Sequence, residues 1–289
     1  MILRGYIPME KGNNMMQYIR KLFHRWQRRI LLSKRQQFVI ITLVLTAGLV
    51  VTQIAHPDMR YPLVLLLSIA SYLLTAFGLR EDLRGVEWFT LLTLPALFTA
   101  AVLLFYFLLP VRWLTRLPVA ILYGVGMYAL ILTENIYNVA AQRSIALLRA
   151  AHSVGFLLTL VTYFLLVSTI LSFRLAVGWT GIAVGLVTGA LSLQALWSVE
   201  LEAKLSARVW QISLGIALMM GELAWIFGFW PVQQALIVLF LTTSLYCTVG
   251  MAQQYLEDKL YKKTVIEFSS VATIVFVILL IATKWRGFV

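Results

Sequence analysis

The sequence predicts an all-helical membrane protein, a bundle of about nine transmembrane helices. Of its 289 residues, 61% are hydrophobic and only 12% are charged, whereas soluble domains contain roughly 45–50% and about 25%. The apolar residues form continuous runs of the length that a helix needs to cross a bilayer. A membrane β-barrel would instead show segments of about ten residues with alternating polarity. Together these observations exclude a soluble globular protein and disfavour a barrel.

The apolar runs follow one another closely and predict one membrane domain, residues 38–289. The predicted spans are residues 38–55, 61–79, 88–110, 117–139, 153–173, 175–199, 209–230, 233–255 and 265–283. Tryptophan favours the membrane–water interface, and Trp88, Trp179 and Trp230 lie near these boundaries. We expect Pro95 to kink the third span and Pro118 to open the fourth.

Lysine and arginine are unevenly distributed between alternate loops. If the N-terminus is cytoplasmic, 18 of the 24 basic residues fall on the cytoplasmic side. Because such an excess orients membrane proteins, we expect a cytoplasmic N-terminus and a C-terminus outside. The same excess accounts for much of the net charge of +12 without any nucleic-acid partner.

Residues 1–37 precede the first span and contain a basic amphipathic segment. Within residues 15–36, apolar side chains recur at helical spacing from Met15 to Ile30. The opposite face carries the basic residues Arg20, Lys21, Arg25 and Arg28, with Arg29 at its border. A helix of this kind suits the surface of an anionic inner leaflet. These residues are therefore candidate lipid-headgroup contacts or orientation anchors, and docking of a partner protein is the alternative.

The sixth span contains small residues at steps of three and four. They are Gly178, Gly181, Gly185, Gly189 and Ser192. Such a face lets another helix approach closely, either within the chain or in a homodimer. Gln194 lies in the same span but away from this face, and we expect it to make a bridging hydrogen bond.

Glu222 is an acidic residue within the seventh span. A charge at mid-span costs roughly 2.5–3.5 kcal/mol on insertion scales, so such a residue is a functional candidate. The helical stripe that it shares with Gln211, Gly215 and Leu218 is expected to face the bundle. Glu222 and Gln211 would then form a site for a proton, a cation or a polar substrate. The alternative is a neutral acid that is hydrogen-bonded to a neighbouring helix.

A second group of polar residues begins at the inner end of the fourth span and runs into the fifth. Its members are Glu134, Asn138, Gln142, Arg143, Arg149 and His152. One continuous helix through both spans would be about 80 Å long, so we expect a break, with an interfacial helix near residues 142–151. Arg143 and Arg149 would suit a lipid headgroup, with Glu134 or His152 as acid or base. A solvated, salt-bridged loop is the alternative.

The sequence contains no HExxH, GxSxG, P-loop or CxxC motif, and Cys247 is its single cysteine. These absences weaken enzymatic interpretations, and we expect no cofactor and no metal centre.

The stretch TENIYNVAAQRSIALLRAAHSVGFLLTLVTYFLL belongs to a longer segment, residues 61–173, that resembles an uncharacterised family of bacterial multi-pass membrane proteins. The resemblance implies a bacterial inner (plasma) membrane and no particular activity.

Three functions remain open. The first is a small transporter or flippase-like protein with Glu222 on its pathway. The second is a non-enzymatic scaffold or accessory subunit that binds membrane proteins or its own copies. The third is a lipid-modifying enzyme at the cytoplasmic face that uses the Glu134–His152 group.

Overall fold

The computed structural model is all-helical in the part of the chain that it describes, residues 33–54, 56–80, 85–109, 113–140, 147–202 and 204–283. By contact the chain divides into two compact units, residues 1–37 and 38–289. Nine helices of the described residues are long and apolar enough to cross a membrane, which confirms the predicted fold class. The basic N-terminal segment, with Arg20, Lys21, Arg25, Arg28 and Arg29, lies outside the described residues.

Each predicted span corresponds to one helix. The helices are α2 (Lys34–Ile54), α3 (Arg60–Leu79), α4 (Glu87–Tyr106), α5 (Trp113–Ala140), α6 (Leu148–Ser172), α7 (Val177–Glu200), α8 (Ala207–Phe227), α9 (Gln234–Leu256) and α10 (Lys262–Ala282), and a short 3₁₀ turn, η1 (Pro57–Met59), follows α2. Several helices begin before their apolar runs, because backbone hydrogen bonding continues into the interfacial region of the bilayer. Pro118 consequently lies inside α5 rather than at its first position.

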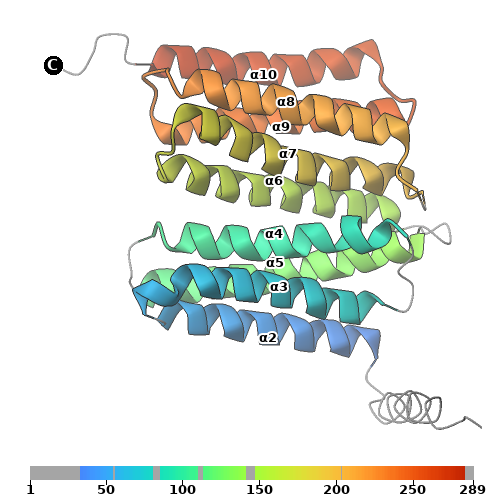
Figure 1. Cartoon of the computed structure of the whole chain (residues 1–289). Coiled ribbons are helices and arrows are strands. Elements are labelled where there is room, and N and C mark those ends of the chain that lie inside the picture. The colour runs from blue at the N-terminus through green and yellow to red at the C-terminus, as the bar shows by residue number, and fades with distance from the viewer. Residues whose placement is uncertain are drawn as a thin grey trace, which may run out of the picture. The chain divides into compact units, whose positions relative to one another are not determined.

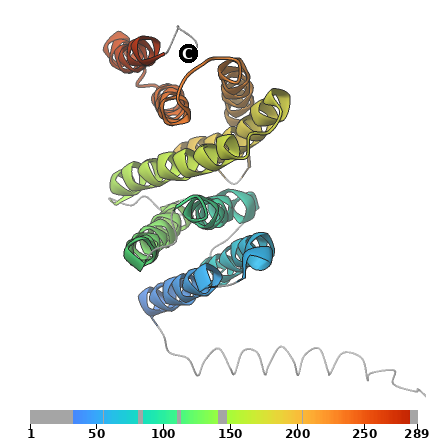
Figure 2. The same cartoon turned by 90° about the vertical axis from the view of Figure 1, so that its left-hand side faces the viewer.

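Within residues 38–283, successive helices alternate in direction (Figures 1 and 2). α3 packs on α4, α4 contacts α5 and α6, and α6 contacts α7 and α9. The helices α7, α8 and α9 contact one another, and α10 packs on α9. Because the directions alternate, α3, α5, α7 and α9 all end at the same end of the bundle.

The small-residue face of α7 packs on α8. A Cβ atom placed on Gly181 would lie 2.9 Å from the backbone oxygen of Gly221, and one on Gly185 would lie 3.2 Å from that of Ala217. Glycine at these positions therefore permits a close approach that any larger residue would oppose.

The same face continues towards the C-terminal end of α7. Gly189 faces the Cβ of Ala217, and the hydroxyl of Ser192 lies 3.5 Å from the carbonyl oxygen of Ser213. Gly178, at the other end, has open space at its Cβ position. The glycine face thus serves packing within the chain from Gly181 onward.

A hydroxyl network surrounds Pro95 in the interior of α4. The Thr99 hydroxyl lies 2.8 Å from the Pro95 carbonyl oxygen, and Ser71 of α3 donates to the same oxygen at 3.2 Å. The Tyr123 hydroxyl of α5 lies 3.0 Å from that of Thr99. Buried hydroxyls in a membrane protein need such partners, so this network ties α3, α4 and α5 together.

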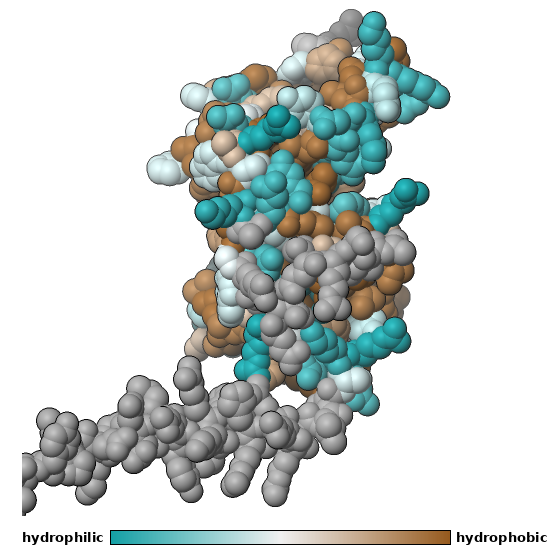
Figure 3. All heavy atoms as spheres, turned by 90° about the vertical axis from the view of Figure 1, so that its right-hand side faces the viewer, coloured by the Kyte–Doolittle hydropathy of each residue, from teal (hydrophilic) through white to brown (hydrophobic). Residues whose placement is uncertain are grey.

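Hydrophilic residues gather on the end of the bundle at which α3, α5, α7 and α9 end, as Figure 3 shows. The described basic residues in or beside the connections at this end are Arg80, Arg149, Lys204, Arg208, Lys259, Lys262 and Lys263. This is the end that the distribution of lysine and arginine predicts to be cytoplasmic.

Candidate functional site

Glu222 and Gln211 do not face the bundle, so the expected orientation of their stripe is wrong. Both side chains are exposed, as are Gly215 and Leu218. The reason is the close packing of α7 and α8. Since α8 turns its small residues, such as Ala217, towards α7, the opposite side of the helix faces outward. This surface therefore does not line the interior of the bundle.

Glu134 is the buried carboxyl of the bundle interior. It lies near the C-terminal end of α5 and is 0% exposed. Its Oε1 atom accepts a hydrogen bond of 3.1 Å from the Nε2 of Gln194 on α7, which confirms the bridging role expected for Gln194. Its Oε2 atom has no hydrogen-bond partner among the described residues. The carboxyl is therefore only half satisfied.

Asn138 lies one turn beyond Glu134 and is also 0% exposed. Its Nδ2 donates to the backbone oxygen of Leu79 at 3.2 Å, which ties the end of α5 to the end of α3. Its Oδ1 has no partner among the described residues. The spacing of four puts Glu134 and Asn138 on the same face of α5, so both amide and carboxyl project into one buried region.

Tyr137 and His152 connect α5, α6 and α7 beside this region. The Tyr137 hydroxyl donates to the Ala151 carbonyl oxygen at 2.9 Å, and its ring lies 5.5 Å from that of His152. The Nε2 of His152 lies 2.8 Å from the carbonyl oxygen of Ser198. His152 thus contacts the backbone of α7 and holds the helices together at this end.

Of the remaining members of the predicted group, only Arg149 lies within the described residues. Arg149 is exposed, and Gln142 and Arg143 lie outside the described residues. The prediction of an interfacial helix near residues 142–151 is wrong for residues 148–151, because these residues form the first turn of α6. Helix α6 begins there because its hydrogen-bonded ladder extends beyond the apolar run, so Arg149 belongs to a spanning helix.

Sequence reasoning missed several residues of this site. Thr75 of α3 is 0% exposed, and its hydroxyl has no partner among the described residues. Gln253 of α9 donates from Nε2 to the carbonyl oxygen of Ala195 at 3.1 Å. The only feature of the sequence that could have indicated these residues was the presence of polar side chains near the C-terminal ends of α3, α5, α7 and α9. Because these helix ends come to the same end of the bundle only in the folded chain, no spacing along the sequence connects them.

The arrangement is suited to holding a proton or a small cation. A buried carboxylate without a compensating positive charge is unfavourable in a membrane. The described residues contain no group of three or more His, Cys, Asp and Glu side chains that would hold a metal ion by those ligands. The hydrogen-bonded contact of the Glu134 carboxyl is with the neutral amide of Gln194.

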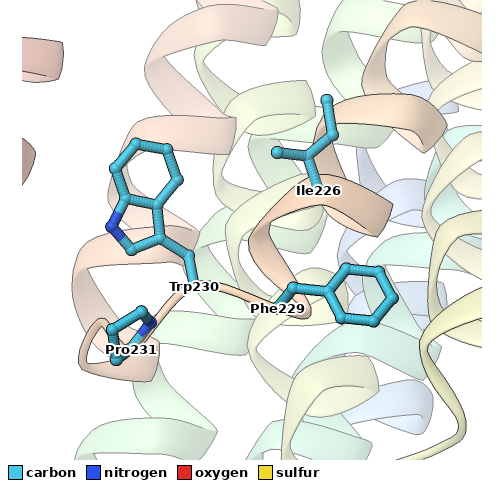
Figure 4. Close-up of a pocket in the computed structure, with 4 residues that line it drawn as sticks. All are labelled: Ile226, Phe229, Trp230 and Pro231. Carbon is cyan, nitrogen blue, oxygen red and sulfur yellow. The ribbon is translucent and has the colours of Figure 1, made fainter. Parts of the chain in front are cut away.

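An open apolar depression of about 320 Å³ lies at the turn between α8 and α9 (Figure 4). Its lining residues are Ile226, Phe229, Trp230 and Pro231. They include no acid or base, and the turn lies at the opposite end of the bundle from Glu134. This depression is separate from the buried polar site.

The nine apolar helices of the described residues define the class, a multi-pass helical membrane protein. The chain belongs to the DUF5656 family of proteins of unknown function, whose model matches residues 119–282. This match extends from α5 to the end of α10 and includes Glu134, Asn138 and Gln194. The resemblance seen in the sequence, over residues 61–173, overlaps it only in residues 119–173. No curated protein and no solved structure matches the chain.

Proposed function

We propose that the protein is a small transporter or flippase-like protein of the bacterial inner membrane, and that Glu134 takes up and releases an ion as part of transport. The observation that carries the proposal is the half-satisfied carboxyl of Glu134, which is 0% exposed. An ionisable residue inside the membrane is costly, and such residues are typical of ion pathways, substrate pathways and proton relays. Its role replaces the one expected for Glu222.

The position of Glu134 in the bundle supports this function. It precedes the end of α5 at Ala140 by six residues, about 9 Å along the helix. With a cytoplasmic N-terminus, this end faces the cytoplasm, and the polar end surface of Figure 3 lies beyond it. An ion would therefore reach Glu134 from the cytoplasm over a short distance.

The other two functions draw less support from the described residues. A scaffold was expected to bind partners through the glycine face of α7, but α8 packs on that face from Gly181 onward. An enzyme was expected to use Glu134 or His152 as acid or base, but Nε2 of His152 lies against the Ser198 carbonyl oxygen. Lipid contacts of the basic N-terminal segment remain compatible with all three functions.

Cysteine accessibility tests the proposal. In a Cys247→Ser background, a single cysteine at position 134 is treated with a small membrane-impermeant maleimide in intact cells and in inside-out vesicles. We expect labelling from the cytoplasmic side, because transport requires water to reach this carboxyl. A cysteine at Ile131, which is buried one turn away, is the matched control and should stay unlabelled.

Absence of labelling at position 134 from both sides, in protein shown to be folded and inserted, would contradict transport through Glu134. Equal labelling at positions 131 and 134 would also contradict it, because it would indicate general opening of the helix bundle. A cysteine at position 222 is a lipid-facing reference that should not react within an intact membrane.

A further inference from the structure

Four buried side chains near the end of the bundle have an oxygen atom without a hydrogen-bond partner among the described residues. The atoms are Thr75 Oγ1, Glu134 Oε2, Asn138 Oδ1 and Gln194 Oε1. Thr75, Glu134 and Asn138 are 0% exposed and Gln194 is 2% exposed. Polar atoms buried to this degree nearly always have partners, so several in one region require an explanation.

The helix register places these side chains at one level. α3 and α5 run in the same direction, and Asn138 donates to the carbonyl oxygen of Leu79. One turn earlier on each helix stand Thr75 and Glu134. Gln194 reaches the same level from α7, since its amide donates to Glu134. Residues from three helices therefore come to one level of the bundle, and Gln194 contacts Glu134 directly.

The two amides have fixed orientations. Nε2 of Gln194 donates to the carboxyl of Glu134, and Nδ2 of Asn138 donates to a backbone oxygen. Each amide nitrogen makes a hydrogen bond, whereas the two amide oxygens have no partner among the described residues. Among the atoms without partners in this group there is no nitrogen. The Glu134 carboxylate would repel an anion, and the unpartnered oxygen atoms of the group are suited to binding a cation.

The charge of the group selects the kind of cation. One carboxylate balances one positive charge, and the other ligand atoms are neutral amide and hydroxyl oxygens. A divalent ion would leave an uncompensated charge in the membrane, which is unfavourable. Oxygen atoms alone suit hard ions rather than transition metals. The chemistry therefore favours a small alkali cation.

We propose that Thr75, Glu134, Asn138 and Gln194 bind one monovalent cation of the size of sodium. The inference rests on the proposed function, because it names the ion that Glu134 takes up. Sodium then competes with the proton for the same carboxyl, and its release towards the cytoplasm is the coupling step of transport.

Thermal unfolding of the purified full-length protein in detergent tests the inference. Tryptophan fluorescence is followed in sodium chloride, potassium chloride and choline chloride at equal ionic strength. We expect a saturable rise in Tm with sodium alone, about 5 °C at one hundred times the dissociation constant. Glu134→Gln should abolish the response, because it removes the charge and keeps the size.

Thr75→Val separates ion binding from folding. It removes a hydroxyl that has no partner among the described residues, so the stability of the protein in choline chloride should not fall. The half-saturating sodium concentration should rise about tenfold, because the ion loses one ligand. Thr159→Val is the matched control. Its hydroxyl is also buried, but it donates to the Gly155 carbonyl oxygen of its own helix. This variant should respond to sodium as the native protein does.

Each result separates the two proposals. An equal rise in Tm in choline, or in Glu134→Gln, would overturn the sodium site, as would the absence of any sodium effect on the native protein. If position 134 is labelled but sodium has no effect, transport through Glu134 stands and its ion is the proton. If sodium binds but position 134 is inaccessible from both sides, the ion is structural and the proposed function fails.

Discussion

The side-chain amide of Gln194 on α7 donates to the carboxyl of Glu134 on α5 at 3.1 Å, although the two residues are 60 positions apart in the chain. Each is buried, and each retains one oxygen atom without a partner among the described residues. This contact is the structural centre of the candidate site, because it joins a carboxyl that is 0% exposed to a second helix.

A double-mutant cycle measures how strongly this contact stabilises the bundle. Gln194→Leu leaves the Glu134 carboxyl without its donor and should lower the free energy of unfolding by about 1–3 kcal/mol. Adding Glu134→Leu should restore much of the loss, because two apolar residues need no hydrogen bond. Reversible unfolding in mixed micelles of neutral detergent and choline dodecyl sulfate, in choline chloride, gives the four free energies. Simple additivity would show that the contact contributes nothing.

We expect the same substitution to affect stability differently at two glycines of α7. A Cβ atom at Gly181 would lie 2.9 Å from the backbone oxygen of Gly221, whereas Gly178 has open space. Gly181→Ala should therefore destabilise the protein by about 1–3 kcal/mol, because neither backbone can easily move. Gly178→Ala should leave stability unchanged or slightly higher. The same unfolding assay checks both variants, and equal effects would mean that α7 and α8 do not pack as described.

Glu222 offers a test of the outward face of α8. Because its side chain is exposed, Glu222→Gln should leave the sodium response of Tm and the accessibility of position 134 unchanged. The comparison with Glu134→Gln is direct, since both changes remove one carboxyl from a spanning helix. A loss of sodium response in Glu222→Gln, with the fold intact, would return this residue to the site.

The membrane orientation can be mapped with two exposed positions. Met59 lies in η1 with 59% of its surface exposed, and Tyr261 lies between α9 and α10 with 67% exposed. In a Cys247→Ser background, we expect a cysteine at position 59 to react with an impermeant maleimide in intact cells. A cysteine at position 261 should react only in inside-out vesicles. The reverse pattern would place Glu134 near the outer surface instead.

Much of the architecture follows from the sequence because the bilayer restricts what a chain can do. An apolar run that crosses it must form a helix, since no water is present to satisfy the backbone groups. The nine runs therefore predict the nine helices of the described residues. The close packing of one face of α7 follows equally from Gly181, Gly185 and Gly189, because only small residues allow it.

The direction in which a spanning helix turns its polar residues is harder to predict, and Glu222 shows why. In water, a polar stripe marks the solvent side of a helix, but in a membrane both lipid and protein neighbours are largely apolar. The polar stripe of Gln211, Gly215, Leu218 and Glu222 therefore does not show whether this side of the helix faces lipid or protein. The decisive feature was the small-residue series Ser213, Ala217 and Gly221, which faces α7.

The sequence by itself determined the class of protein, the number of spans and the candidacy of Glu134, since each depends on local composition and helical spacing. Only the tertiary structure decided that Glu134, rather than Glu222, lies inside, and that Gln194 contacts it. The physical reason is that hydrogen bonds between helices depend on which faces pack together. Which faces pack together depends on shape complementarity between helices that are distant in the sequence.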